Sequence, residues 1–291
     1  MDWQPHHTSW FSAILLLIVL LSAVLFSACG QPLPTPHAPV LLRLSGSTSM
    51  QPLLRDLAAA YSERYEHVSF DFSAVGSFAG MEELRRGNAD LALVARLLQP
   101  DEEYDTRTRK RLLAYTVIAQ DGIAVVVNEG NPLRMLTLYQ VRKIFEGQIT
   151  NWAELGSPAG DILVISREDG SATREVFEEL VMGGRRVTTT ALIMPGSEAV
   201  RDYVATHGGA IGYLSMGYLG TGIAALAIAD ALPNRQTVED SSYPITRPFL
   251  LVSLPEPSAQ VTAFMQFVRS PAGQAIVRRT YGGARAGSSV R

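Results

Sequence analysis

The stretch ISREDGSATREVF, residues 165–177, joins a strand-like segment to a helix-like one and indicates the class of fold. The apolar run ILVI leads into it, and apolar residues at helical spacing follow it. Arg167, Asp169, Gly170 and two hydroxyl residues occupy the joint. The first N–H groups of a helix have no partner within the helix, and the helix dipole places roughly +0.5 charge there. An anion is therefore a natural ligand for this joint.

The same order of strand and helix recurs along the chain. Strand-like patterns occupy residues 40–46, 68–76, 89–95, 121–128, 161–166, 189–194, 209–215, 222–229 and 249–254. Helical patterns occupy residues 52–65, 81–88, 137–147, 173–182, 197–207 and 259–270. This alternation predicts α/β layers with largely parallel sheets.

Composition limits the kind of partner. The 291 residues are 47% hydrophobic and 18% charged, enough for a large core and for roughly two domains of ordinary size. The formal net charge is only −3, so neither a nucleic-acid surface nor a polybasic membrane surface is expected.

The N-terminal segment predicts export and tethering. Residues 11–28 are apolar and end in small residues before Cys29, the single cysteine, so an intramolecular disulfide is excluded. This pattern resembles a bacterial lipoprotein signal. Residues 1–28 would be the signal peptide, Cys29 the lipidated first residue, and residues 29–39 a proline-rich linker. The alternative is an uncleaved anchor helix, because the run approaches the ~20 residues that span a bilayer.

Two further strand-to-helix joints have the same style, SGSTSMQP at residues 45–52 and AVGSFAGMEEL at residues 74–84. For one joint alone, helix capping explains the hydroxyl residues. Three helix starts, however, supply about +1.5 and Arg167 adds +1, which balances the −1.5 to −2 of a phosphate-like group without a metal. Asp169 is expected either to pair with Arg167 and hold its guanidinium in place, or to cap the following helix.

Five segments, taken in order, carry a family resemblance: SGSTSMQPLL, VGSFAG, NADLALVAR, REDGSATREVF and GGAIGYLSMGYL. Together they resemble the phosphate-binding proteins that serve ABC importers, from about residue 40 to about residue 282. The resemblance implies a type II periplasmic-binding-protein fold of two α/β lobes, each a mostly parallel sheet flanked by helices, joined by two hinge crossings. The crossings would lie near residues 120–128 and 217–225. Lobe 1 would comprise residues 40–120 and 226–291, and lobe 2 residues 121–225, with hinge segments at both ends.

The resemblance also implies the residues that bind the ligand. Those that match the anion loops of the family are Thr48, Ser49, Ser77, Arg167, Ser171, Ala172 (through its backbone N–H) and Thr173. Asp169 and Arg96 would support them, Arg96 either by adding charge or by covering a rim.

Three positions depart from the family pattern. Ala95 stands where family members have an aspartate or a serine, and an aspartate there accepts the proton of hydrogen phosphate and rejects sulfate. Alanine can do neither. Phe78 and Ala172 replace residues that are usually glycine, and either could narrow the cleft.

The expected function is a lipid-anchored receptor on the extracytoplasmic face of the bacterial cell membrane. It would bind inorganic phosphate in the inter-lobe cleft and deliver it to the permease subunits of an ABC importer, as a monomer without cofactor, metal or nucleic acid. Because of Ala95, a receptor for sulfate, molybdate or tungstate is the main alternative, and a tethered phosphate sensor or a non-binding homologue is another. An enzyme is not expected, because neither GxxxxGK[ST] nor GxSxG occurs and His67 and His207 fall in loops.

Overall fold

The computed structural model describes Met1 and residues 38–284. The predicted signal peptide, Cys29 and nearly all of the predicted linker lie outside the described residues. Within the described part of the chain, no helix is long and apolar enough to cross a membrane.

Lobe 1 is built on a mixed sheet. Its strands, in spatial order, are β2 (Val68–Ser73), β1 (Val40–Gly46), β3 (Leu91–Val94), β11 (Thr246–Ser253) and the first part of β4 (Ala114–Asn128). The first three are parallel, whereas β11 is antiparallel to both of its neighbours. The helices of this lobe are α2 (Gln51–Arg64), α3 (Ser77–Arg85), α4 (Pro100–Glu103), α9 (Ala259–Arg269) and α10 (Pro271–Val277). The short β12 (Gly282–Gly283) pairs with β4.

Lobe 2 continues from the second part of β4. That part pairs with β8 (Ala210–Ser215) and β9 (Ile223–Ala225), β6 (Leu163–Arg167) lies parallel to β8, and β7 (Leu192–Met194) lies parallel to β6. Its helices are α5 (Leu138–Phe145), α6 (Ala172–Leu180) and α7 (Ser197–Thr206), and α8 (Arg235–Glu239) follows them. A small separate sheet joins β5 (Met135–Leu136) to β10 (Ala227–Ile228). Among the described residues, three short 3-10 helices also occur: η1 (Thr48–Met50), η2 (Trp152–Leu155) and η3 (Met216–Tyr218).

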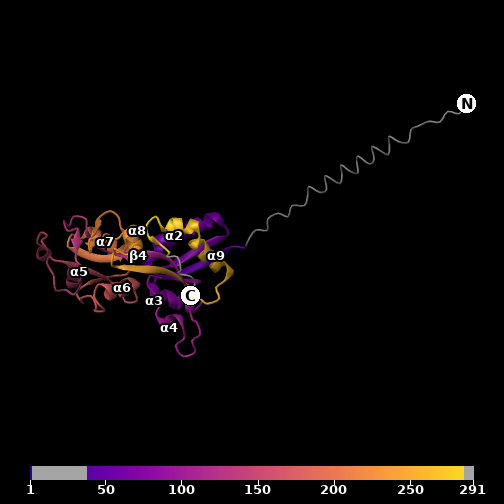
Figure 1. Ribbon diagram of the computed structural model, residues 1–291, viewed down its shortest axis with the longest axis horizontal. Coiled ribbons are helices and arrows are strands. Elements are labelled where there is room, and N and C mark those ends of the chain that lie inside the picture. The colour runs from indigo at the N-terminus through magenta and orange to yellow at the C-terminus, as the bar shows by residue number, and fades with distance from the viewer. Residues whose placement is uncertain (2–37, 285–291) are drawn as a thin grey trace. The chain divides into compact units, whose positions relative to one another are not determined.

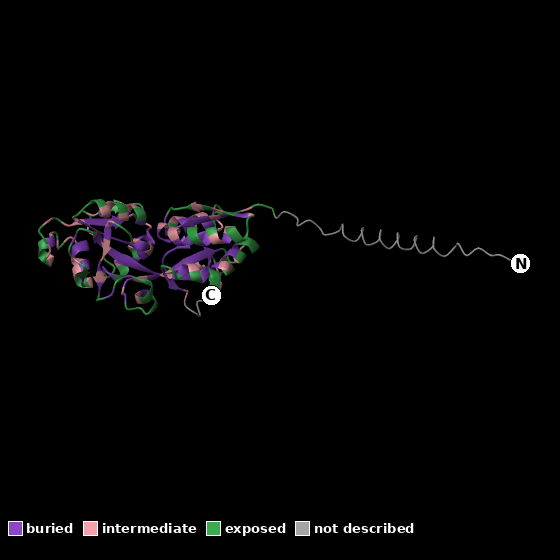
Figure 2. Ribbon diagram, turned by 90° about the horizontal axis from the view of Figure 1, so that it is seen from above, coloured by how far each residue is buried: buried purple, intermediate pink, exposed green. Residues whose placement is uncertain are grey.

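The two lobes have separate hydrophobic cores. Leu44, Leu54 and Phe264 belong to the core of lobe 1, and Phe145 and Phe177 to that of lobe 2. Figure 1 shows α5, α6 and α7 in one lobe and α2, α3, α4 and α9 in the other, with β4 running between them. Figure 2 shows buried residues through both lobes and along the strands that join them.

Strand β4 makes the first crossing between the lobes. It is 15 residues long, and its partner changes from β11 to β8 at Ile123. Ile118 packs in the core of lobe 1 and Val125 in that of lobe 2. The crossing predicted at residues 120–128 falls within this strand.

The return crossing differs from the prediction. Leu226, Ile228 and Ile245 are part of the lobe 2 core, whereas Phe249 is part of the lobe 1 core. We therefore propose that the return lies in β11 rather than near residues 217–225. Most of the buried apolar residues of 226–245 pack in the lobe 2 core, whereas Val238 of α8 packs in that of lobe 1. The sequence gives no sign of this continuation, because Pro248 suggests a strand that starts after it. In the structure β11 passes through Pro248, and its register shifts at the next residue.

Candidate functional site

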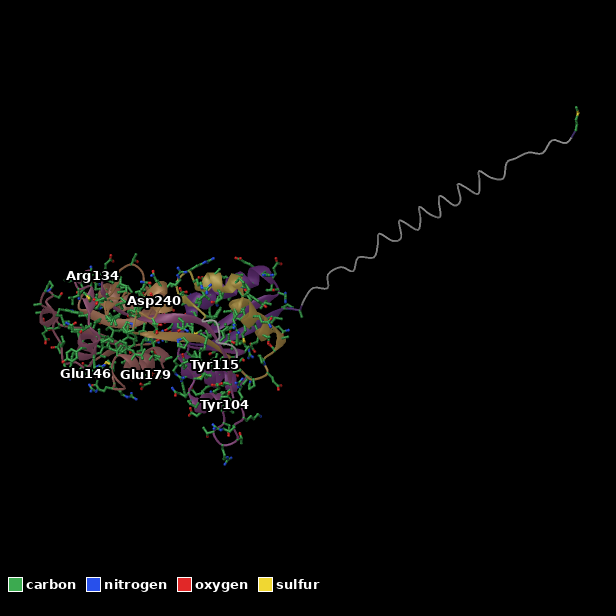
Figure 3. All side chains as sticks on the ribbon, in the orientation of Figure 1. Tyr104, Tyr115, Arg134, Glu146, Glu179 and Asp240 are labelled. Carbon is green, nitrogen blue, oxygen red and sulfur yellow. The ribbon has the colours of Figure 1, made fainter. Side chains whose placement is uncertain are left out.

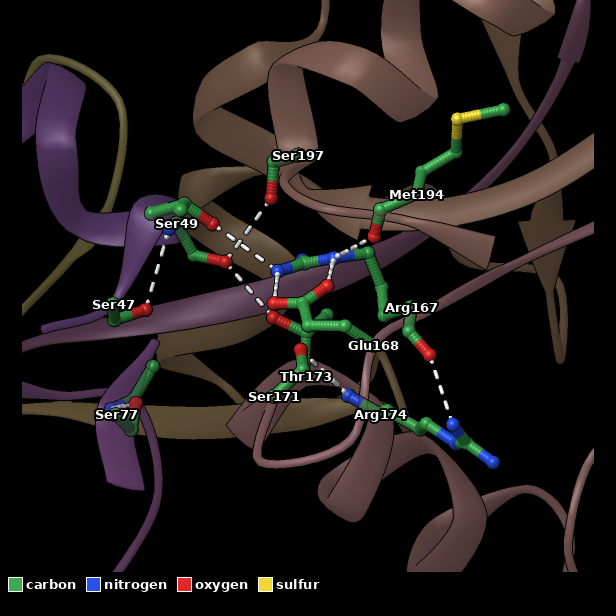
Figure 4. A network of polar contacts seen from close by, with 12 residues as sticks. Ser47, Ser49, Ser77, Arg167, Glu168, Ser171, Thr173, Arg174, Met194 and Ser197 are labelled. Carbon is green, nitrogen blue, oxygen red and sulfur yellow. Dashed lines mark hydrogen bonds and ion pairs between the residues drawn. The ribbon is translucent and has the colours of Figure 1, made fainter. Parts of the chain in front are cut away.

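Hydroxyl groups from both lobes meet where several helices begin. The Ser49 hydroxyl of lobe 1 lies 2.9 Å from the Thr173 hydroxyl and 3.1 Å from the Ser197 hydroxyl, both in lobe 2. Arg167 Nη2 donates to Thr48 Oγ1 at 3.2 Å across the same gap. Figure 4 shows the Ser49 hydroxyl between those of Ser197 and Thr173. Two of the three predicted loops, far apart in sequence, are thus in direct contact.

Arg167 is one cation that contacts this cluster, and it is only 1% exposed. Its Nε and Nη2 each bind one carboxylate oxygen of Glu168 at 2.8 Å, and Nε also donates to the Met194 carbonyl at 3.3 Å. Its Nη1 is buried and has no hydrogen-bond partner among the described residues. A buried donor without a partner is costly, so Nη1 is a group that an oxyanion acceptor would satisfy.

The prediction for Asp169 was wrong in both of its forms. The Asp169 side chain is 85% exposed and binds Arg174 Nη1 at 3.1 Å. The cap of α6 is Ser171, whose hydroxyl accepts from the Arg174 amide. Glu168 takes the role expected of Asp169, because it directly follows the last residue of β6 and lies beside the Arg167 guanidinium.

Ser77 and the first turn of α3 lie on another side of the cluster (Figure 4). The Ser77 hydroxyl is buried and accepts from the Ala95 amide at 3.3 Å, so its own hydrogen is available to a ligand. Gly76, at φ 88°, precedes this turn, and a Cβ on it would lie 3.5 Å from the carbonyl oxygen of Gly170 in lobe 2. The second and third predicted loops therefore also approach one another.

The departures from the family pattern have different surroundings. Ala95 is fully buried, and its side chain offers no acceptor. Ala172 is also buried and packs with the lobe 1 core, although it belongs to α6. Phe78 is 55% exposed, and its Cβ lies 3.6 Å from where a Cβ on Gly170 would be.

Arg96 pairs with carboxylates rather than with the hydroxyl cluster. Its Nη1 and Nη2 bind Glu102 at 2.7 and 2.8 Å, and its Nε lies 2.5 Å from the Glu175 carboxylate. Glu175 belongs to α6, so this ion pair links lobe 1 to lobe 2. The role of Arg96 at the site therefore stays a prediction.

Residues 33–272 match the family described as PBP superfamily domain. The chain belongs to the PBP superfamily. Its two-lobed α/β fold is the type II fold that the sequence predicts, and this prediction is confirmed.

This PBP superfamily member is similar in sequence to proteins named phosphate-binding protein PstS. The one from Bacillus subtilis is 29% identical over 205 residues, which cover 70% of this chain and 67% of the relative. The one from Borreliella burgdorferi is 23% identical over 276 residues, which cover 91% of this chain and 95% of the relative.

Two solved structures have a higher sequence identity to this chain than these two relatives have. A phosphate ABC transporter substrate-binding protein from Clostridium perfringens, solved with bound phosphate, is 33% identical with a TM-score of 0.78. The match covers 84% of this chain and 100% of that one. An ABC-type phosphate transport receptor from Vibrio cholerae is 31% identical with a TM-score of 0.67, over 83% and 99% of the two chains. The resemblance to phosphate-binding proteins that serve ABC importers is thereby confirmed.

A buried ion pair that sequence reasoning missed lies next to the site of this PBP superfamily member. Arg247 Nε donates to Asp121 Oδ2 at 2.9 Å, and Arg247 Nη1 donates to Thr173 Oγ1 at 2.8 Å. Burial raises the pKa of Asp121 to about 6, while the Arg247 guanidinium and the Ser215 hydroxyl lower it. The available signal was a single charged residue at the start of each of two apolar runs, DGIAVVVN and RPFLLV.

Ser197 was also missed as a member of the cluster. It is fully buried and is the first residue of α7. The segment PGSEAV places glycine and serine at a helix start, as the three predicted loops do, so the same rule would have found it. Among residues 38–284, no group of three His, Cys, Asp or Glu side chains could hold a metal ion.

Proposed function

We propose that this PBP superfamily member is a receptor that binds inorganic phosphate between its lobes and delivers it to an ABC importer. The observation that carries the proposal is the buried Arg167, whose Nη1 lacks a partner and whose Nη2 reaches the opposite lobe at Thr48. The relatives named phosphate-binding protein PstS and the phosphate-bound structure from Clostridium perfringens support phosphate as the ligand.

The balance of charge explains how an anion could be held without a metal. The Glu168 carboxylate offsets the charge of Arg167, so the positive potential comes mainly from helix starts. The first turns of α3, α6 and α7 together supply about +1.5. This is close in magnitude to the negative charge of a phosphate group near neutral pH, which is about −1.5 to −2. Desolvation of the anion requires a donor for each of its oxygens, and the clustered hydroxyls and first-turn amides would provide them.

The binding residues remain those predicted, with one change. Thr48, Ser49, Arg167 and Thr173 would contact the anion from one side, and Ser77, Ser171 and the Ala172 amide from the other. Glu168, in place of Asp169, would hold the guanidinium. A hinge motion through β4 and β11 would bring these groups together on binding.

A receptor for a fully ionised oxyanion, such as sulfate or molybdate, is the second candidate. Ala95 favours it, because its buried side chain cannot accept a proton from hydrogen phosphate. Both oxygens of the nearby Glu168 carboxylate are already engaged by Arg167.

The location and partners are part of the same proposal. The receptor would be tethered through a lipid on Cys29 at the extracytoplasmic face of the membrane, would act as a monomer, and would dock to permease subunits. It would bind and release its ligand without chemical change, as expected of the binding proteins it resembles. The support is the apolar run before Cys29 and the transport proteins among its relatives.

Calorimetric titration of the purified protein with phosphate, sulfate and molybdate in turn tests the ligand. Saturable binding of phosphate, with sulfate and molybdate at least tenfold weaker, is the expected result. Tighter binding of sulfate or molybdate would support the second candidate instead, and no binding of any of the three would contradict both.

A further inference from the structure

The two strands that cross between the lobes carry an ion pair that reaches the binding site. Arg247 of β11 stands directly opposite Asp121 of β4 in the antiparallel register. Arg247 Nε and Nη2 both lie 2.9 Å from Asp121 Oδ2, and the two residues are 2% and 0% exposed. The third nitrogen, Nη1, donates to the Thr173 hydroxyl at 2.8 Å. The guanidinium thus extends from the crossing strands to the first turn of α6.

The chemistry of this contact gives it a direction. A guanidinium has donors only, so Thr173 Oγ1 must accept from Arg247. The single hydrogen of the Thr173 hydroxyl is then left to donate elsewhere, either to Ser49 Oγ at 2.9 Å or to a bound anion. Ser49 Oγ lies in turn 3.1 Å from Ser197 Oγ. Arg247 is therefore the first group in a row of hydrogen-bonded side chains that continues through the hydroxyls of Thr173, Ser49 and Ser197. This row links the crossing strands to both lobes.

We infer that Arg247 is a positioning residue for anion binding, an inference that rests on the proposed function. It orients the Thr173 hydroxyl so that its hydrogen points toward the anion. A hydroxyl that rotates freely can present a lone pair to an anion, whereas an oriented donor binds without that ordering cost. Because Asp121 neutralises the Arg247 charge, the effect comes from orientation more than from added charge. This role differs from that of Arg167, because the unpartnered Arg167 Nη1 is available to the ligand, whereas Arg247 Nη2, which also lacks a hydrogen bond, lies 2.9 Å from Asp121 Oδ2.

A double-mutant cycle on phosphate affinity tests the inference. The variants are T173V, D121N/R247M and their combination, each titrated with phosphate by calorimetry. D121N/R247M removes both charges together, so no buried charge is left alone. If Arg247 acts through Thr173, we expect about tenfold weaker binding for each change in the wild type, as for one lost hydrogen bond. The combined variant should bind phosphate no more than about threefold more weakly than T173V or D121N/R247M alone, because both changes would remove the same oriented hydrogen bond.

S77A provides the matched control. The Ser77 hydroxyl bonds to the Ala95 amide and not to the row that Arg247 heads, so S77A should cost the same factor with or without D121N/R247M. The inference is overturned if T173V also costs the same factor in both backgrounds. If D121N/R247M shows no cooperative melt, R247K replaces it, because one ammonium can face Asp121 but lacks the fork that reaches Thr173.

Failure of the inference and failure of the proposed function give different results. A wild-type protein that binds no phosphate overturns the proposed function, and the inference with it. A wild-type protein that binds phosphate, combined with independent effects of T173V and D121N/R247M, overturns the inference alone.

Discussion

Replacing Glu175 with glutamine should weaken phosphate binding without harming the fold. The Glu175 carboxylate in α6 lies 2.5 Å from Arg96 Nε, and Arg96 follows β3 in the other lobe. In E175Q, Arg96 would keep its two hydrogen bonds to Glu102, at 2.7 and 2.8 Å, so no buried charge would lose its last partner. The change therefore removes a contact between the lobes and little else.

The expected loss of phosphate affinity depends on how exposed the Arg96 and Glu175 side chains are. Two unit charges 4 Å apart attract by about 4 kcal/mol at an effective dielectric constant of 20. Solvent screens this pair strongly, because the Glu175 side chain is 44% exposed, although that of Arg96 is only 9% exposed. Exposed pairs are worth about 0.2–1 kcal/mol, and we take the upper end. If the contact is lost when the lobes open, as the proposed hinge motion requires, the loss of about 1 kcal/mol should reduce the apparent affinity about fivefold.

Calorimetric titration with phosphate measures this effect, with E179Q as the matched control. Glu179 lies on the same helix and is exposed (Figure 3), so E179Q should bind like the wild type. Both variants should melt at the wild-type temperature, and the difference in affinity should shrink at about 1 M salt. Equal affinities of E175Q and E179Q would refute the reasoning.

Three further predictions concern the site and its surroundings. Arg167→Ala should weaken phosphate binding more than Ser77→Ala in calorimetry, because a charge-assisted hydrogen bond is worth about 1.5–3 kcal/mol and a neutral one about 1; equal losses would remove Arg167 from the site. Glu168→Gln removes the charged partner that holds the Arg167 guanidinium, so it should weaken phosphate binding severalfold. Asp169→Asn changes a side chain that is 85% exposed, so it should leave the phosphate affinity within twofold of the wild type. Burial raises the pKa of Glu102, but hydrogen bonds from a buried arginine outweigh it and place the pKa below its ordinary value. The stability that Glu102 contributes is therefore present at neutral pH and lost as pH falls through that lowered pKa, so E102Q should lower the melting temperature at pH 7 but less at pH 3.

Three of the helix starts at the candidate site could be predicted because their signals are local. Glycine and hydroxyl residues directly after an apolar run mark a strand that ends and a helix that begins, as at Ser49, Ser77 and Ser171. Which carboxylate holds Arg167 is not a local matter. Glu168 and Asp169 are adjacent and chemically alike, and only the path of the chain through the turn at Gly170 distinguishes them.

Contacts between distant segments were beyond sequence reasoning. The pairing of Arg247 with Asp121 depends on the register of two crossing strands, which no local pattern specifies. The helix α10 was missed for another reason, since its sequence PAGQAIV contains glycine, which disfavours helix. In the structure a Cβ on Gly273 would lie 2.3 Å from the Phe267 carbonyl oxygen, so close packing against α9 requires glycine there.

A crystal structure of the protein with phosphate tests the central claim most directly. The account predicts phosphate between the lobes, with an oxygen within hydrogen-bond distance of Arg167 Nη1 and others near the hydroxyls of Ser77 and Thr173. Phosphate bound elsewhere, with Arg167 Nη1 still unpartnered, would contradict it.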